Sequence, residues 1–282
     1  MKTVLVTGGT DGIGKGLALH YLAQGYKVFA VGSSAEKGEK LIAEASNSNL
    51  VFLQANLSLV SENLRIVKAV TEQTEALDAL VLCAASLKPQ PAYIETAEGI
   101  EFTFALYYLS RYVLCHQLKS LLDKAESPVI LNVAAPGMKG KVFWDDLQMK
   151  QSYNGTNAQF HGSRLNDLLG VSFTETDANR KIRYILFNPM AARTPGATKM
   201  GGDSGMMKIM MKLYYKFCGK DVSELVEIID KDLRSVGAGL SAFKLDKSVD
   251  LGMETFDKNN ADKLCKYTEL LSPICKMRKM GI

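Results

Sequence analysis

Residues 3–16 read Thr-Val-Leu-Val-Thr-Gly-Gly-Thr-Asp-Gly-Ile-Gly-Lys-Gly, and this stretch decides the fold of the chain. Its first five residues form an apolar, β-branched run, which predicts a strand over residues 3–7. Gly8, Gly12 and Gly14 follow, and a helix is expected to begin near Ile13. Because glycine has no Cβ, backbone N–H groups can approach an anion at the positive end of that helix. The stretch therefore predicts a binding site for the pyrophosphate of a dinucleotide.

A glycine-rich turn between a strand and a helix can also be purely structural. Here the helix is expected to run from about Gly14 to Gln24, and Gly25 ends it before a second apolar run at residues 27–31. Strand, helix and strand make one complete βαβ unit. That context favours dinucleotide binding over a turn that binds nothing.

Strand and helix patterns alternate along the rest of the chain. We expect helices at residues 35–46, 61–75, 99–122 and 158–176, and strands at residues 51–55, 79–82, 129–133, 183–187 and 239–245. Such alternation predicts a parallel sheet with right-handed crossovers. No linker-like composition divides the 282 residues. We therefore predict one α/β domain over residues 1–282, a Rossmann fold with a doubly wound parallel sheet of about seven strands and helices on both faces.

Charge and cysteine content exclude several functional classes. The formal net charge of +4 comes from 34 basic and 30 acidic side chains with no basic stripe, so we expect no nucleic-acid partner. The five cysteines show neither Cys-x-x-Cys nor Cys/His spacing, so no disulfide framework and no metal site is expected. No apolar run approaches the ~20 residues of a membrane span, and the first strand leaves no room for a signal peptide. We expect a cytoplasmic protein.

Residues 7–14, Thr-Gly-Gly-Thr-Asp-Gly-Ile-Gly, resemble the Thr-Gly-x-x-x-Gly-Ile-Gly signature of the short-chain dehydrogenase/reductase family. The resemblance extends to about residue 272, and the insertion at residues 142–155 is similar to the retinol-dehydrogenase-like branch. It implies NAD(P)(H) binding. The cofactor contacts that it implies are Gly8, Thr10, Asp11, Gly12, Ile13, Gly14, Ser33, Ser34, Asn56, Leu57, Ala84, Arg164, Pro189 and Thr194.

The choice between NAD and NADP is expected at Gly32-Ser33-Ser34, directly after the second strand. An acidic residue there would bind the ribose 2′-OH of NAD, and a basic one the 2′-phosphate of NADP. Neither is present. Ser33 and Ser34 have hydroxyls for a phosphate and Lys37 is near in sequence, whereas Asp11 would repel a phosphate. The balance slightly favours NADP(H) over NAD(H).

The catalytic positions depart from the family pattern. Family members use Asn, Ser, Tyr and Lys, and the matching residues here are Tyr107, Ala135, Phe160 and Arg164. Phe160 and Arg164 keep the i, i+4 spacing that puts both on one helix face, but Phe160 has no proton to give. Loss of general acid catalysis raises the barrier by about 3 to 5.5 kcal/mol, and loss of the serine hydrogen bond by about 3 kcal/mol more. Ordinary ketone or alcohol turnover should be very slow.

Other candidate residues have a structural explanation. We interpret His161 as a surface or supporting residue, Cys83 as unreactive, and the neighbouring Asp145 and Asp146 as helix caps or solvated charges rather than an acid/base pair. Residues 206–217 are rich in methionine and aromatic side chains, and the resemblance implies a substrate lid around residues 196–236. A methionine-lined lid suits an apolar ligand, although core packing of an amphipathic helix explains the pattern nearly as well.

Three functions remain open. The first is an atypical oxidoreductase for an apolar, electron-poor small molecule, such as an iminium or a conjugated enone, that accepts hydride without an acid. The second is a non-redox catalyst such as a cyclase, isomerase or dehydratase, with a structural dinucleotide and Tyr107 handling protons. The third is a catalytically silent nucleotide-binding protein that acts through a partner. The intact glycine turn places the oxidoreductase marginally first, and a homo-oligomer is compatible with the sequence.

Overall fold

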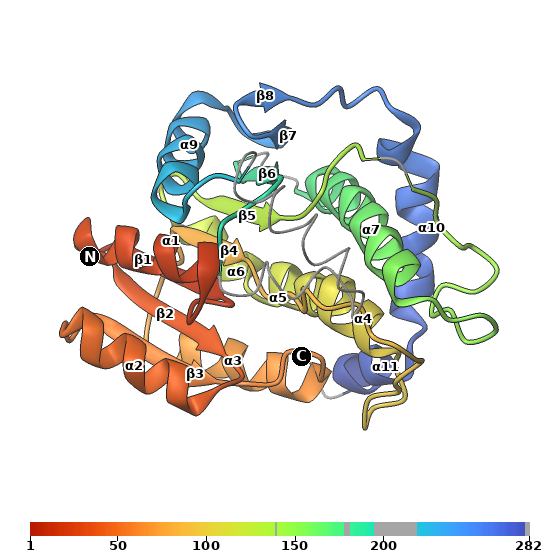
Figure 1. Cartoon of the computed structure of the whole chain (residues 1–282), viewed down its shortest axis with the longest axis horizontal. Helices are drawn as coiled ribbons and strands as arrows, with labels where there is room; N and C mark the ends of the chain where they lie inside the picture. The colour runs from red at the N-terminus through yellow and green to blue at the C-terminus, as the bar shows by residue number, and fades with distance from the viewer. Residues whose placement is uncertain (139, 178–180, 195–218, 280–282) are drawn as a thin grey trace.

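A computed structural model describes residues 1–138, 140–177, 181–194 and 219–279 of the chain. Within these residues one sheet has the strand order β3-β2-β1-β4-β5-β6-β7-β8 (Figure 1). The strands are β1 Thr3–Thr7, β2 Lys27–Gly32, β3 Leu50–Gln54, β4 Ala79–Leu82, β5 Val129–Val133, β6 Arg183–Asn188, β7 Gly239–Lys244 and β8 Lys247–Ser248. Strands β1 to β7 pair in parallel, which confirms the predicted sheet. The unpredicted β8 pairs antiparallel with β7, and its two residues are too few to show a periodicity.

Helices cover both faces of the sheet (Figure 1). The alternation of side chains along β1 shows this directly. Leu5 belongs to a core with residues of α3, α5 and α7, whereas Val4 and Val6 belong to a second core with residues of α1 and α9. The described helices are α1 Gly12–Ala23, α2 Ala35–Ala45, α3 Val60–Thr71, α4 Phe102–Phe104, α5 Ser110–Gln117, α6 Lys119–Lys124, α7 Gly155–Thr176, α9 Val222–Ser235, α10 Lys258–Glu269 and α11 Ser272–Lys279.

The helix predicted over residues 99–122 is divided into shorter pieces. A π-helical turn, Ala105–Leu109, separates α4 from α5, and α6 follows Leu118. The π turn contains Tyr107, the residue that matches the family's catalytic asparagine. Hydrophobic periodicity predicted one helix because the apolar face continues across all of these pieces.

The predicted substrate lid, residues 196–236, lies largely outside the described residues, as does the methionine-rich segment 206–217. The part of the lid region that is described contains α9, which packs on α1. A Cβ added to Gly16 of α1 would lie 2.4 Å from Cγ1 of Val222, so the two helices are in close contact. The substrate-covering role stays a prediction.

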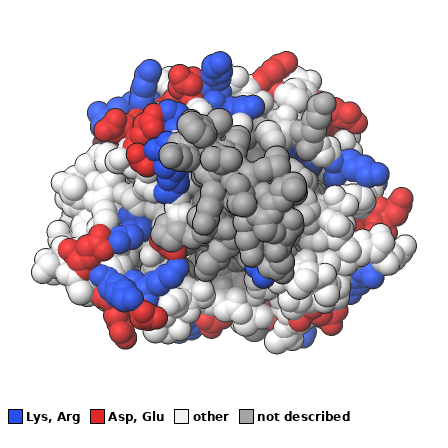
Figure 2. All heavy atoms as spheres, viewed as in Figure 1, with Lys and Arg blue, Asp and Glu red and all other residues white. Residues whose placement is uncertain are grey.

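Charged side chains of both signs are interspersed around the rim of the face in Figure 2. None of the described helices is long and apolar enough to cross a bilayer. Nor do three or more His, Cys, Asp or Glu side chains gather, among the described residues, in a way that could hold a metal ion.

Candidate cofactor and active site

The turn between β1 and α1 is built so that only glycine fits at its tightest points. Gly8 and Gly12 have φ angles of +65° and +52°, a conformation that L side chains rarely adopt. A Cβ on Gly8 would lie 3.0 Å from the carbonyl of Cys83, and one on Gly14 would lie 2.3 Å from the carbonyl oxygen of Gly8. The turn therefore holds its backbone against the end of β4 and presents the N-terminus of α1, as a pyrophosphate site requires.

Asp11 caps α1 and carries a charge that is neutralised locally. Its carboxylate accepts a hydrogen bond from the N–H of Gly12 at 2.8 Å and forms an ion pair with Lys37 of α2. The hydroxyl of Ser34 accepts from the N–H of Lys37 at 3.3 Å, so Ser34 is the N-cap of α2. Repulsion of a phosphate by Asp11 is thereby weakened, and the ends of β1 and β2 are tied together.

The segment after β6 closes over the glycine turn. A Cβ on Gly12 would lie 3.1 Å from Cγ2 of Thr194, so Thr194 is next to the turn, where a cofactor contact was predicted. Met190, which stands where the family has glycine after Pro189, has a φ of +54°. Its N–H donates to Oδ1 of Asn188 at 2.8 Å. The backbone thus adopts a glycine-like conformation with a methionine side chain.

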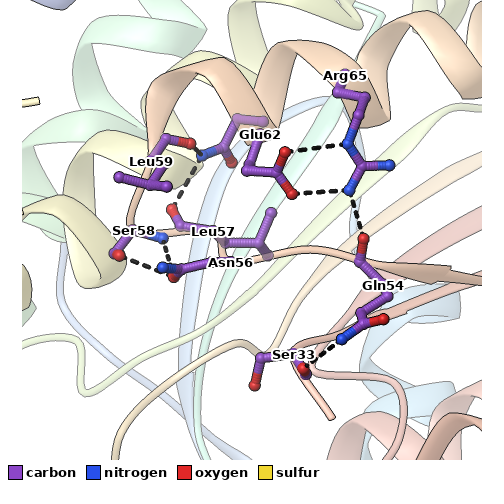
Figure 3. Close-up of polar contacts among 9 residues, drawn as sticks. Ser33, Gln54, Asn56, Leu57, Ser58, Leu59, Glu62 and Arg65 are labelled. Carbon is purple, nitrogen blue, oxygen red and sulfur yellow. Dashed lines mark hydrogen bonds and ion pairs between the residues drawn. The ribbon is translucent and has the colours of Figure 1, made fainter. Parts of the chain in front are cut away.

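Asn56 and Leu57, predicted to contact adenine, lie in a turn between β3 and α3 (Figure 3). Oδ1 of Asn56 accepts from both the N–H and the Oγ of Ser58, at 3.2 and 2.8 Å (Figure 3). Leu57 is buried. The acceptor oxygen on which the adenine contact depends is therefore already used within the turn, and that contact stays a prediction.

The end of β3 is also tied to Ser33 and to α3 (Figure 3). The Gln54 side chain donates to the carbonyl of Ser33 at 3.2 Å, while the backbone carbonyl of Gln54 accepts from Arg65. Arg65 pairs with Glu62 at 2.7 Å, and this hydrogen bond lowers the pKa of the Glu62 carboxyl. Ser33 and Asn56 are thus held at neighbouring strand ends.

The end of β4 is fixed by Thr7 of β1. Oγ1 of Thr7 accepts the N–H groups of Cys83 and Ala84 at 3.1 and 3.2 Å. Burial raises the pKa of the Cys83 thiol to about 12, which supports the interpretation that Cys83 is unreactive. Ala84, a predicted cofactor contact, lies directly against the glycine turn, since a Cβ on Gly8 would be 3.0 Å from its N atom.

Of the four positions that match the catalytic tetrad, Ala135 and Arg164 are in direct contact, and none of the four presents a free acid. The Tyr107 hydroxyl donates to the carbonyl of Ser86 at 2.5 Å, and burial raises its pKa to about 12. Phe160 is 45% exposed and lines a surface cavity of about 390 Å³ with Gly140, Lys141, Phe143, Asn157 and His161. Ala135 offers only its backbone carbonyl, which accepts from Arg164.

Arg164 is buried, and both terminal nitrogens of its guanidinium bind protein groups, whereas its Nε has no hydrogen-bond partner among the described residues. Its guanidinium pairs with Asp167 at 3.0 Å and donates to the carbonyls of Ala135 and Met138. Asp167 also accepts from Oγ1 of Thr255 at 2.7 Å, and burial raises the pKa of its carboxyl to about 7 against the lowering effect of Arg164. Arg164 thus fastens the loop after β5 onto α7, and its predicted ribose contact stays a prediction.

Two neighbouring candidates are structural, and one interpretation needs correction. His161 is buried rather than on the surface, its Nε2 lies 3.0 Å from the carbonyl of Leu147, and burial lowers its pKa. The surface alternative was wrong because the loop before α7 folds over this face of the helix. Asp146 accepts the N–H groups of Lys150 and Gln151, both at 2.8 Å, so it stabilises a turn of its own loop and caps no helix, since α7 begins only at Gly155.

Sequence reasoning missed a buried polar network behind the tetrad positions. Arg111 of α5 donates to Oδ1 of Asn132. Nδ2 of Asn132 in turn donates to Oδ1 of Asn166 at 2.9 Å and to the hydroxyl of Tyr184 at 3.0 Å. Nδ2 of Asn166 donates to the carbonyl of Tyr107 at 2.7 Å. An arginine and an asparagine inside otherwise apolar runs were the signal that could have revealed it, because buried polar groups need partners.

The profile of the short chain dehydrogenase family matches residues 2–144. The NmrA-like family domain-containing oxidoreductase notO of Aspergillus sp. (strain MF297-2) is 27% identical over 206 residues, which cover 69% of this chain and 61% of that protein. Retinol dehydrogenase 11 of Homo sapiens is 28% identical over 184 residues, 64% of this chain and 56% of that protein. The chain thus spans less than two thirds of the length of these relatives.

Among solved structures, a 3-ketoacyl-(acyl-carrier-protein) reductase from Brucella melitensis complexed with NADH has the same fold. The superposition has a TM-score of 0.65 and covers 86% of this chain and 96% of that chain, at 20% identity. Because the family profile covers half of the chain and the glycine turn carries the family signature, the chain belongs to the short-chain dehydrogenase/reductase family and has its NAD(P)-binding fold.

Proposed function

We propose that the chain binds NAD(P)(H) and acts as an atypical oxidoreductase on an apolar, electron-poor small molecule, with NADP(H) slightly favoured over NAD(H). The supporting observation is the combination of a fully built glycine turn with tetrad positions that offer no ready acid. Phe160 and Ala135 have no polar side chain, and Arg164 is paired with Asp167. A substrate that already carries a positive charge or a conjugated carbonyl needs no strong proton donor.

Different residues would bind different parts of the cofactor. When bound, the dinucleotide supplies the hydride. The backbone N–H groups at the start of α1 would bind its pyrophosphate. Ser33 and Ser34 would face its ribose end, and the Lys37 cation near them offsets the charge of Asp11. Those two hydroxyls and that cation support the preference for NADP(H).

A non-redox reaction is the second candidate, and Tyr107 favours it. Tyr107 is the one tetrad position with a hydroxyl, and the side chain of Gln159 donates to the same Ser86 carbonyl at 2.8 Å. A cyclase, isomerase or dehydratase would use this polar pair without consuming the dinucleotide, and a silent nucleotide-binding protein would use neither. Cytoplasmic location and homo-oligomerisation also remain predictions.

The first test is a titration of the purified chain with NADPH and NADH, combined with mass spectrometry of co-purifying molecules. A change in nicotinamide absorbance with the true substrate supports the oxidoreductase. Product without cofactor turnover supports the non-redox catalyst, and a stable complex with neither supports the silent protein. Failure to bind either dinucleotide overturns the proposal.

The second test restores the family's groups. The triple variant Phe160→Tyr, Ala135→Ser and Arg164→Lys should reduce model ketones at least about 100-fold faster than the parent, because it regains a general acid and a hydrogen bond to the substrate oxygen. Phe143→Tyr, which adds a hydroxyl to the same cavity outside the motif, is the matched control and should give no gain. No gain in the triple variant would mean that the pocket no longer accepts a ketone in the family's orientation.

A further inference from the structure

Arg111 places a positive charge beneath the carboxyl edge of the sheet. The residue is 3% exposed and lies on α5. Its Nη2 donates to the carbonyl of Ala84, just beyond β4, at 3.2 Å, and its Nη1 donates to the carbonyl of Val133, the last residue of β5, at 3.0 Å. The guanidinium therefore bridges the ends of two neighbouring strands.

The acceptors of Arg111 are all neutral. Besides the two carbonyls they are the Oδ1 atoms of Asn132 and Asn166, the latter at 3.4 Å. In the part of the chain that the structure describes, no carboxylate lies within 4.0 Å of this guanidinium, and its Nε–H has no hydrogen-bond partner. Arg164, by contrast, is paired with Asp167. Since a guanidinium stays protonated when buried, Arg111 is a buried cation compensated only by dipoles.

This cation adjoins the cofactor turn. Gly8 packs against Cys83 and Ala84, and a Cβ on Gly14 would lie 3.2 Å from Cβ of Cys83. The same Ala84 accepts from Arg111. Strands β1 and β4 are neighbours at the point where the strand order reverses, and open α/β sheets bind ligands outside the carboxyl ends of the strands at this point. A dinucleotide on the glycine turn would lie over the edge that Arg111 supports.

We propose that the buried charge of Arg111 makes the site discriminate between the two redox forms of the dinucleotide, so that the reduced form binds more tightly. This inference rests on the proposed cofactor binding. The oxidised nicotinamide ring carries one positive charge and the reduced ring carries none, while the phosphates are the same in both. A fixed cation repels only the oxidised ring. If the separation were on the order of 10 Å, with an effective dielectric constant of about 20, such a repulsion would be worth roughly tenfold in affinity.

The test compares dissociation constants of oxidised and reduced dinucleotide, because their ratio cancels the phosphate contacts. Fluorescence and calorimetric titrations with NADPH, NADP⁺, NADH and NAD⁺ are done on the parent chain and on two variants. Arg111→Met removes the charge. Asn132→Asp keeps the shape of the partner and gives Arg111 a carboxylate. Asn259→Asp on the exposed face of α10 changes the net charge equally and serves as the control.

In the parent and in Asn259→Asp the oxidised form should bind roughly tenfold more weakly than the reduced form, and in both test variants the ratio should fall toward one. If Arg111→Met does not fold, Asn132→Asp decides, since it retains the arginine. A parent ratio near one, or an unchanged ratio in Asn132→Asp, overturns the inference and leaves the proposed function intact. Binding of none of the four dinucleotides overturns the proposed function itself.

Discussion

Met190 shows how far a single residue can depart from its family while the backbone stays the same. The resemblance places a glycine here, and the φ of +54° is one that glycine adopts without strain. A side chain with a Cβ raises the energy of this conformation by about 1 to 2 kcal/mol. The Asn188 side chain, which holds the N–H of Met190, stabilises the strained turn.

We therefore expect Met190→Gly to be more stable than Met190→Ala by about 0.5 to 1 kcal/mol in free energy of unfolding. Both variants lose the same partly exposed side chain, but only the alanine variant keeps the backbone strain at position 190. The unfolded chain of the alanine variant has less conformational entropy than that of the glycine variant, which offsets part of the strain energy. Denaturant unfolding measures the difference. Met253, with a φ of −67°, is the control position, and there alanine should be the more stable. Equal stability of the two variants at position 190 would show that the turn is not strained.

At the residue scale, the sequence predicted those features that depend only on the local backbone conformation. The need for glycine at Gly8 and Gly12 follows from the signature itself. The i, i+3 spacing of Arg164 and Asp167 makes them neighbours on one helix face. The contacts of Arg164 with the loop after β5 could not be predicted, because a helix face does not show which loop folds over it. The loop carbonyls of Ala135 and Met138 decide where the guanidinium points.

At the scale of elements, the loop after β5 is fastened to α7 by hydrogen bonds from its backbone to both members of one buried ion pair. Asp167 contacts Arg164, Thr255 and the N–H of Gly137, so three segments meet at this carboxylate. One of its oxygens, Oδ1, has no hydrogen-bond partner among the described residues. The Asp167 carboxylate thus joins the three segments, but one of its two oxygens is buried without a hydrogen bond.

This arrangement predicts a pH dependence of stability. Burial raises the folded-state pKa of Asp167 to about 7 from the ordinary aspartate value of 3.8. Between these values the folded state binds more protons than the unfolded state, so the contribution of Asp167 falls as pH rises from about 4 to about 7 and is constant above. Asp167→Asn removes this titration. The free energy of unfolding of the parent minus that of Asp167→Asn should therefore decrease across this range in urea titrations.

Asp145→Asn, an exposed neighbour of the same loop, is the control for this experiment and should leave the pH profile of the parent unchanged. A parallel pH profile for the parent and Asp167→Asn would contradict the raised pKa.

The helix predicted over residues 99–122 shows what could and could not be predicted about a single element. Periodicity identified the apolar face that faces the core, but it could not locate the π turn at Ala105–Leu109. The carbonyl of Tyr107 in that turn accepts a hydrogen bond from Nδ2 of Asn166, which lies on α7. Such a tertiary hydrogen bond leaves no trace in local sequence.

For the whole molecule, ligand binding and folding are linked. A dinucleotide that binds only the folded chain at 100 times its dissociation constant raises the free energy of unfolding by about 2.7 kcal/mol, and the melting temperature by about 5 °C or more. Differential scanning fluorimetry with the preferred dinucleotide measures this shift. Gly12→Ala should abolish it, because the turn cannot keep its shape.

Gly99→Ala introduces a Cβ at a similar positive φ, with nothing within 4 Å, and is the matched control that should keep the shift. A shift of equal size in Gly12→Ala would show that the dinucleotide binds elsewhere.

The parallel sheet and its two helical layers were the most predictable feature of the whole molecule. Alternating strand and helix patterns leave few topologies once right-handed crossovers are required. The buried network of Arg111, Asn132 and Asn166 was the least predictable, because it joins α5, β5 and α7 across more than fifty residues of sequence.

The contact between Gly16 and Val222 joins two stretches that are far apart in sequence, and it should also make replacements at these two positions depend on each other. A methyl group at position 16 would overlap the valine, so the two positions share one fixed volume. In a diverging lineage, a larger residue at 16 should become established only together with a smaller one at 222. Paired replacement of this kind would leave a covariation signal between the start of α1 and the start of α9.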